Sequence, residues 1–334
     1  MITAINKAII HILDFNSGIT VFSEQELDIE NKSVLTYLTK HIEKLINDSG
    51  SNSGNFSPDS NFKKKLFEYV SVNVDFTSFS VYIAKLIHSA ISQSDILEPA
   101  DLIVCDVNID DDRFIVILKC NNKVGFTHQV IKNEGKIKNE IINHYAILPN
   151  ISQKIDEYAI IDVNSLSIKF SDKKRFVDGK DTYVLPDKVL ECNSSISPKN
   201  VIDLLHSITR KVSENHGQSS VAAISKAKNY LVENAEVSEY LDPIELGKEV
   251  FSSSHIMQEE YIKEVKSTGI PESVKVDRSF AIKKGKNHKI KTDTGIEITF
   301  PADYFHNKDY IEFINNPDGT LSIEMKNIGK IINK

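Results

Sequence analysis

The spacing of apolar residues along the chain changes from one region to the next, and this spacing predicts the elements. From Ser33, apolar positions recur every three or four residues as far as Ile46, which predicts an amphipathic helix with Ser33 as its N-cap. The same period predicts a helix over about Phe76–Ser92. Residues 48–60 begin with small polar residues that are too poor in apolar groups to pack, so we expect a mobile loop there.

Strand patterns fill the rest of the first half. Two extended runs, Asp101–Asn108 and Arg113–Lys119, flank the acidic residues Asp110, Asp111 and Asp112, which predicts an antiparallel hairpin with an acidic turn. Other strands are predicted near Ile5–Asp14, Ile142–Leu148, Glu157–Val163 and Leu166–Phe170. The fold class expected for this half is therefore α+β, an antiparallel sheet with helices on it.

The second half begins as a helical region. Ser197 and Pro198 supply an N-cap and a proline at the first position of a helix that closes near Gly217. Further helices are expected over about Ser219–Glu233 and from Asp242, and their short connections predict antiparallel neighbours. Strand patterns return after Pro271, so this half is predicted to be a helical layer carrying a small C-terminal antiparallel sheet.

Together these patterns predict two domains. Residues 1–195 form the α+β domain, and residues 196–334 form the helical region with a small basic β domain. No apolar run approaches the roughly 20 residues that cross a bilayer, and the first residues do not resemble a signal peptide. We therefore expect a cytoplasmic protein that does not bind membranes.

Charge is concentrated near the C-terminal end. Between Lys275 and Lys291 the chain has six Lys and one Arg against the single acidic residue Asp277, or about +6 in a chain whose formal total is -7. Such a local excess of cations favours a polyanionic partner even on an acidic molecule. The alternative is a solvated hairpin that keeps a sheet edge soluble. The candidate DNA-binding residues are Lys275, Arg278, Lys283, Lys284, Lys286, Lys289 and Lys291.

The order of motifs in this region resembles a known family. Residues 290–298 followed by Pro301, and residues 310–324 with the turn Asn316-Pro317-Asp318-Gly319-Thr320, are similar to the C-terminal signature of the bacterial NdpA-type nucleoid-associated proteins. Residues 5–14 and 114–119 are similar to that family's opening and central strands. The resemblance implies a nucleoid location and DNA, most simply double-stranded, as the partner. It supplies no catalytic residues.

The residues give no support for catalysis or a cofactor. Cys105, Cys120 and Cys192 have no disulfide or zinc spacing, and the ten His are scattered, so no metal site is predicted. The acidic turn Asp110–Asp112 with Lys119 raises the alternative of a metal-dependent nuclease. That chemistry needs an acidic residue two positions before the Lys, where this chain has Ile117. We therefore expect no enzymatic activity.

Two function classes stay open. The first is a nucleoid-associated protein that binds DNA with strong salt dependence and weak sequence selectivity, because Lys contacts phosphate as a point charge and Arg is scarce. The second is a protein-interaction module that contacts DNA indirectly, through nucleoid proteins. A homodimer is expected because two-fold symmetry doubles the phosphate contacts. Smaller basic groups, expected to be solvated, are Lys63–Lys65, Lys132 with Lys136 and Lys138, and Lys173–Arg175.

Overall fold

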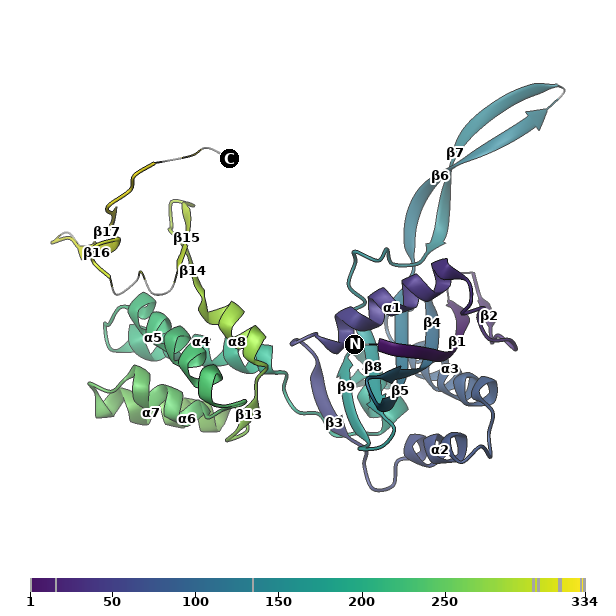
Figure 1. The fold of residues 1–334 in the computed structure, drawn as a ribbon, viewed down its shortest axis with the longest axis horizontal. Helices are drawn as coiled ribbons and strands as arrows, with labels where there is room; N and C mark the ends of the chain where they lie inside the picture. The colour runs from purple at the N-terminus through teal and green to yellow at the C-terminus, as the bar shows by residue number, and fades with distance from the viewer. Residues whose placement is uncertain are drawn as a thin grey trace. The chain divides into compact units, whose positions relative to one another are not determined.

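The computed structural model describes residues 2–15, 17–133, 135–301, 304, 307–317, 320–330 and 332. The chain divides into two compact units, residues 1–197 (unit 1) and 198–334 (unit 2). Figure 1 colours the chain from purple at the N-terminus to yellow at the C-terminus, so unit 1 runs from purple to teal and unit 2 from green to yellow. Each unit has its own helices and strands, and the α+β fold class is confirmed.

Unit 1 is built on a seven-stranded antiparallel sheet with the strand order β2-β1-β4-β5-β8-β9-β3. Its strands are β1 (Ile2–Asp14), β2 (Ile19–Val21), β3 (Asn52–Asn55), β4 (Ala100–Ile109), β5 (Asp112–Asn121), β8 (Glu157–Asp162) and β9 (Ser167–Ser171). The hairpin predicted around the acidic turn is confirmed, because β4 pairs with β5 in register from Ala100 opposite Asn121 to Ile109 opposite Asp112.

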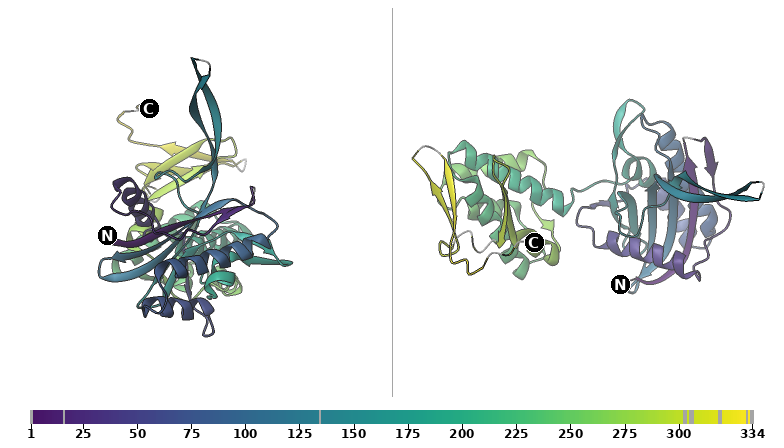
Figure 2. Two further views of the ribbon diagram at one scale, coloured as in Figure 1. Left: turned by 90° about the vertical axis from the view of Figure 1, so that its right-hand side faces the viewer. Right: turned by 90° about the horizontal axis from the view of Figure 1, so that it is seen from above.

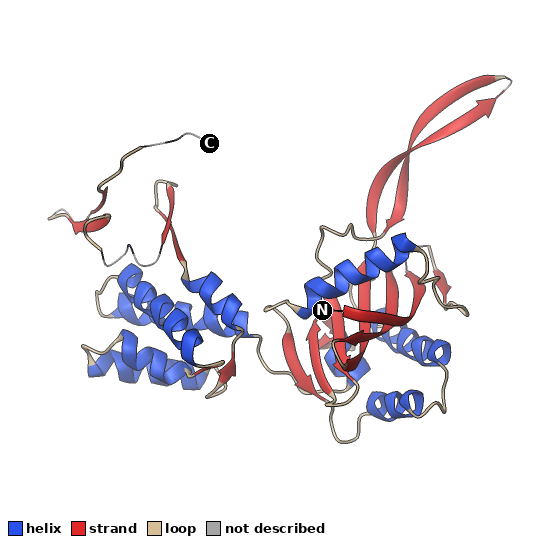
Figure 3. Cartoon of the chain, viewed as in Figure 1, coloured by secondary structure: helices blue, strands red, loops and turns tan. Residues whose placement is uncertain are grey.

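Helices cover both faces of this sheet, as Figure 3 shows in blue against red. Helix α1 (Lys32–Ile46) packs on one face, and α2 (Asn61–Val70), α3 (Phe76–Ser92) and the π-helix η1 (Val184–Leu190) pack on the other. Alternate strand residues therefore enter two cores: Ile103 lies on the α1 side, and Leu102 and Val104 lie on the α3 side. Burial of both faces explains why these strands are almost continuously apolar.

Two sequence predictions in this region need correction. The helix α1 is capped by Asn31, whose side chain accepts from the Ser33 backbone N–H, so Ser33 is not the N-cap. The expected loop at 48–60 contains the edge strand β3, which pairs with β9. The other side of this strand packs against the segment after η1, where a Cβ on Gly54 would lie 2.5 Å from the Asn193 carbonyl oxygen. Only a glycine lets the two backbones approach so closely.

Two hairpins extend unit 1 beyond its sheet. The strand predicted near Ile142–Leu148 is the end of β7 (Lys136–Ile147), which pairs with β6 (Lys123–Asn133) in a long two-stranded hairpin that we call the arm. Figure 1 and Figure 2 show the arm projecting away from the sheet. A shorter hairpin joins β10 (Lys174–Val177) to β11 (Lys180–Tyr183).

Unit 2 is a helical layer. It contains α4 (Pro198–Asn215), α5 (Ser220–Val237), α6 (Pro243–Val250), α7 (His255–Ser267) and α8 (Arg278–Gly285). The helix starts predicted at Ser219 and Asp242 are confirmed, and both residues are N-caps whose side chains accept hydrogen bonds from the first turn. Their apolar faces share one core that includes Leu205, Leu231 and Tyr261.

The terminal strands of unit 2 form short hairpins. The pairs are β12 (Tyr240–Leu241) with β13 (Val274–Lys275), β14 (Asn287–Lys291) with β15 (Glu297–Pro301), and β16 (Ile311–Asn315) with β17 (Leu321–Met325). Of the turn that contributed to the family resemblance, Asp318 and Gly319 lie outside the described residues. Helix α8 was not predicted, and it occupies half of the lysine-dense segment.

Candidate nucleic-acid interface

The lysine-dense segment divides into two places in unit 2. Lys275 lies on β13, where its amine is 3.5 Å from a carboxylate oxygen of Glu239, and Arg278 begins α8. The other five predicted cations follow one another from the last turn of α8 into β14; they are Lys283, Lys284, Lys286, Lys289 and Lys291. The predicted set is therefore divided between Lys275 and Arg278, which lie before or at the start of α8, and the five lysines at its end and on β14.

Helix α8 is positioned by its cap and by one glycine. Asp277 accepts a hydrogen bond from the Phe280 backbone N–H at the N-terminus. Lys283 and Lys284 occupy the last turn, where the negative end of the helix dipole stabilises their positive charge. Near the other end, a Cβ on Gly285 would lie 2.8 Å from the Lys228 carbonyl oxygen and 2.3 Å from Val232. This close approach fixes the C-terminal end of α8 against α5.

The hairpin that follows α8 continues the row of cations. Lys289 and Lys291 alternate along β14 and therefore share a face, and both approach Glu297 on β15, at 2.7 Å and 3.9 Å. Each of these lysine side chains is more than half exposed. One carboxylate therefore serves two lysines, which leaves an excess of positive charge on this face of the hairpin.

Helix packing adds a cation that the sequence did not indicate. The Lys228 amine on α5 donates to the Asn287 carbonyl oxygen at 3.1 Å and so lies beside the start of β14. Burial, and then the charge of Lys284, lower the pKa of Lys228. We call Lys228, Lys283, Lys284, Lys286, Lys289 and Lys291 the basic cluster. Repulsion between Lys228 and Lys284 indicates a positive potential that a bound anion would relieve.

Helix α4 borders the basic cluster with one carboxylate and one histidine. Asp203 forms an ion pair with Lys284 at 2.8 Å. Burial, and then the positive charge of Lys228, lower the pKa of His206 to about 4. The His206 Nε2 atom is buried with no hydrogen-bond partner among the described residues. His206 is therefore neutral at neutral pH, and Asp203 and Glu297 are the carboxylates paired with the basic cluster in the described chain.

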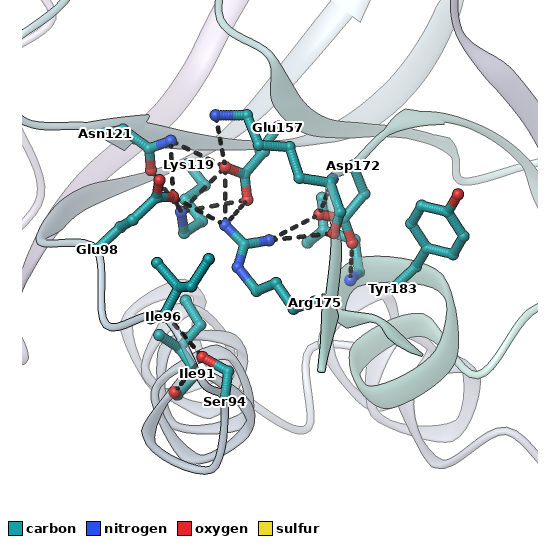
Figure 4. A network of polar contacts seen from close by, with 12 residues as sticks. Ile91, Ser94, Ile96, Glu98, Lys119, Asn121, Glu157, Asp172, Arg175 and Tyr183 are labelled. Carbon is teal, nitrogen blue, oxygen red and sulfur yellow. Dashed lines mark hydrogen bonds and ion pairs between the residues drawn. The ribbon is translucent and has the colours of Figure 1, made fainter. Parts of the chain in front are cut away.

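The smaller basic groups predicted from the sequence lie in unit 1, and one of them is not solvated. Arg175 is 5% exposed, which corrects the expectation that Lys173–Arg175 is a solvated face. Its guanidinium lies 2.8 Å from Glu157 and 3.1 Å from Glu98, and Glu157 in turn contacts Lys119 at 3.2 Å, as Figure 4 shows. We call Glu98, Lys119, Glu157, Asp172 and Arg175 the buried charge network.

The positions of Asp112 and Lys119 do not fit the nuclease alternative. Asp112 begins β5 and Lys119 lies near its other end, so the two are about 23 Å apart at a strand rise of about 3.3 Å per residue. The Lys119 amine is instead held by Glu157. Within the described chain, no group of three or more His, Cys, Asp or Glu side chains is arranged to hold a metal ion.

Comparison with known proteins concerns the chain as a whole. A family model described as nucleoid-associated protein YejK matches residues 9–333. This match confirms the resemblance to nucleoid-associated proteins that the motifs indicated. No curated protein matches the sequence. None of the described helices has the length and apolar character that a bilayer crossing requires.

Proposed function

The chain belongs to the family of the nucleoid-associated protein YejK, and from this premise we propose that it binds double-stranded DNA directly through the basic cluster. The proposed role is binding and not catalysis, and its proposed location is the nucleoid within the cytoplasm. The family match supports the nucleoid-associated role, and the basic cluster supports the chemistry of contact.

The observation that carries the proposal is the excess of cations in the basic cluster. Its six lysines are paired with two carboxylates, Asp203 and Glu297, among the described residues. Lysine contacts a phosphate as a point charge and lacks the planar fork with which Arg reads guanine. The expected binding therefore depends on the DNA backbone, falls steeply with salt, and varies little with sequence.

The direct test is fluorescence anisotropy with two labelled duplexes of unrelated sequence over a range of salt. Release of about one counterion for each net positive charge predicts a slope of log affinity against log salt of about -4, equal for both duplexes. A flat salt dependence, or no binding at low salt, would contradict direct binding. In that case the chain would be an interaction module that reaches DNA through nucleoid proteins.

Two matched charge-reversal variants test whether the basic cluster is the surface that binds DNA. Lys283 and Lys286 are exposed and three residues apart, and Lys263 and Lys266 on α7 are exposed with the same spacing. K283E/K286E should weaken DNA binding by about tenfold or more at low salt, whereas K263E/K266E should change it little. Lys284 is left unchanged because a Glu there would face Asp203. Equal losses in both variants would mean that only the total charge matters.

A further inference from the structure

One face of the arm carries more exposed apolar side chains than the other. Cross-strand partners in an antiparallel ladder point to the same side, so Phe126 with Asn143, His128 with Ile141, Val130 with Asn139, and Lys132 with Ile137 share one face. The large apolar side chains of this face are Phe126, Val130, Ile137 and Ile141, which are between 54% and 80% exposed. They form a continuous zigzag along the hairpin, which we call the apolar stripe.

Such a hairpin is unusual in isolation. A two-stranded ribbon is marginally stable in water, and three or more strands or a second layer are needed to bury a hydrophobic face. The arm projects away from the sheet of unit 1 (Figure 1), so the sheet does not supply that layer. Exposed apolar surface of this length marks an interaction site. A nucleic acid is the weaker match for this face, because among its paired positions only Lys132 is a cation.

The charges of unit 1 indicate what covers the stripe. The end of the arm has exposed cations at Lys132, Lys136 and Lys138. Unit 1 also has an acidic segment between β2 and α1, with exposed carboxylates at Glu24, Glu26, Asp28 and Glu30. Since the arm points away from its own sheet, its cationic end lies away from the acidic segment of the same copy. A second copy offers both an apolar stripe and an acidic segment.

We propose that unit 1 self-associates by exchanging arms: the apolar stripe packs on the apolar stripe of a second copy, and the cationic end of the arm lies against that copy's acidic segment. Two such faces, each about 36 Å long and about 10 Å wide, bury about 700 Å² in total. That area is below the roughly 1,200 Å² of a stable interface, so the arm-to-body contact is needed to complete it. The contact is isologous, as a two-fold dimer requires.

Sedimentation velocity over a range of protein concentration tests the stripe. The unaltered protein should be a dimer, and I137S/I141S should raise the dimer dissociation constant about 100-fold, because two large apolar side chains lose their partners. Ile256 and Ile296 in unit 2 are 68% and 59% exposed, close to Ile137 at 68%, so I256S/I296S is the matched control and should leave the dimer intact. A monomer at every concentration of the unaltered protein would overturn the proposal.

Exchanging the charges of the two surfaces tests the proposed contact between the cationic end of the arm and the acidic segment. Among the described residues, Glu24 and Glu30 form no ion pair, whereas Glu26 contacts Lys7 at 3.2 Å, so the first two are the sites to change. Lys138 is left unchanged because it is paired with Glu140 on the arm itself. K132E/K136E and E24K/E30K should each weaken the dimer about tenfold, and their combination should restore it. Failure of the combination to restore the dimer would overturn the arm-to-body contact.

The same variants separate this proposal from the proposed DNA binding. Dimerisation is measured without DNA, so it stands or fails independently of the basic cluster. If I137S/I141S loses DNA affinity while its mass stays that of the unaltered protein, the apolar stripe contacts DNA and the proposed dimer contact is wrong. If it becomes monomeric and each copy keeps its DNA affinity, the dimer contact is supported and the DNA surface lies elsewhere.

Discussion

The buried charge network of unit 1 and the basic cluster of unit 2 use the same kinds of side chain in opposite ways. In unit 1, Lys119, Glu157 and Arg175 are at most 3% exposed as side chains, and cations and carboxylates face one another. In unit 2, Lys289 and Lys291 are more than 60% exposed and share one carboxylate. The first arrangement uses its charges within the fold, and the second leaves positive charge for a partner.

Burial determines this difference. A buried ion must be matched, because an uncompensated charge in a protein interior costs several kcal/mol. Burial alone would raise the pKa of Glu157, but Lys119 and Arg175 lower it, so that carboxyl is ionised and bound to both. Exposed pairs such as Lys289 with Glu297 contribute at most about 1 kcal/mol, so a phosphate can replace Glu297 at little cost. The comparison predicts stability effects in unit 1 and binding effects in unit 2.

Removal of the central carboxylate of the buried charge network should have the largest effect. E157Q leaves Lys119 and Arg175 buried without their main partner, and it should destabilise unit 1 by about 3–5 kcal/mol. Chemical denaturation followed by circular dichroism, with hydrogen exchange to assign the change to unit 1, measures this. E98Q is the control, since Glu98 touches the same two cations but is 37% exposed, and it should cost about 1 kcal/mol or less. Equal effects would show that burial does not distinguish the two carboxylates.

A methyl group at Gly285 should have the next largest effect, and it acts on both stability and binding. G285A places a Cβ in contact with Val232 and the Lys228 carbonyl oxygen, so α8 must shift from α5 at a cost of about 1–3 kcal/mol. The shift should also weaken DNA binding, because the basic cluster spans both helices. G329A is the control, since a Cβ there meets no atom within 4 Å. Unchanged hydrogen exchange in α8 would contradict the close packing.

Acidification should act on unit 2 through His206. Its pKa is 6.5 in the unfolded chain and about 4 when folded, so the unfolded state binds the proton first. The stability that it contributes is complete above pH 6.5 and is lost as the pH falls toward 4, by at most about 1.4 kcal/mol per pH unit. Hydrogen exchange in α4 at several pH values measures this. H206N should flatten the dependence, and an unchanged dependence would place its origin elsewhere.

Neutralising a single cation of the basic cluster should have the smallest effect. K228Q removes one charge beside Lys284 and should make the salt slope of DNA binding less negative by about 0.9, with an affinity loss of a few-fold at low salt. Lys226 is exposed on the same helix, and K226Q is the matched control that should leave the slope unchanged. If both variants change the slope equally, the whole of α5 and not the basic cluster faces DNA.

Local patterns predicted the elements whose apolar residues are regularly spaced. The bounds of α3 were predicted as observed, and Asp242 was identified as a helix start, because capping and periodicity are properties of neighbouring residues. Helix α8 was missed because its apolar residues Phe280, Ala281 and Ile282 are consecutive and show no helical spacing. Helix α2 was missed although Phe62, Leu66 and Tyr69 follow its N-cap at helical spacing, so its signal was present.

Less of the candidate site could be predicted from the sequence. The lysines from Lys283 to Lys291 are close in sequence and were predicted together, but Lys228 joins them only through the packing of α5 against α8. Glu157 likewise reaches Lys119 through the pairing of β5 with β8, and Arg175 arrives from a separate hairpin. Such contacts depend on tertiary structure, which no local pattern of the sequence records.

The position of β1 in the sheet has a consequence for synthesis of the chain. In the sheet β1 lies between β2 and β4, and β4 begins only at Ala100, far along the chain from β1. The edge strand β3 likewise cannot pair until β9 has been synthesised. Pairings this distant in sequence slow folding, whereas the helical neighbours of unit 2 are close along the chain. During synthesis, the residues of β1 that lie beyond its short pairing with β2 therefore stay without a strand partner until β4 has left the ribosome, and transiently exposed apolar strands of this kind are prone to aggregation.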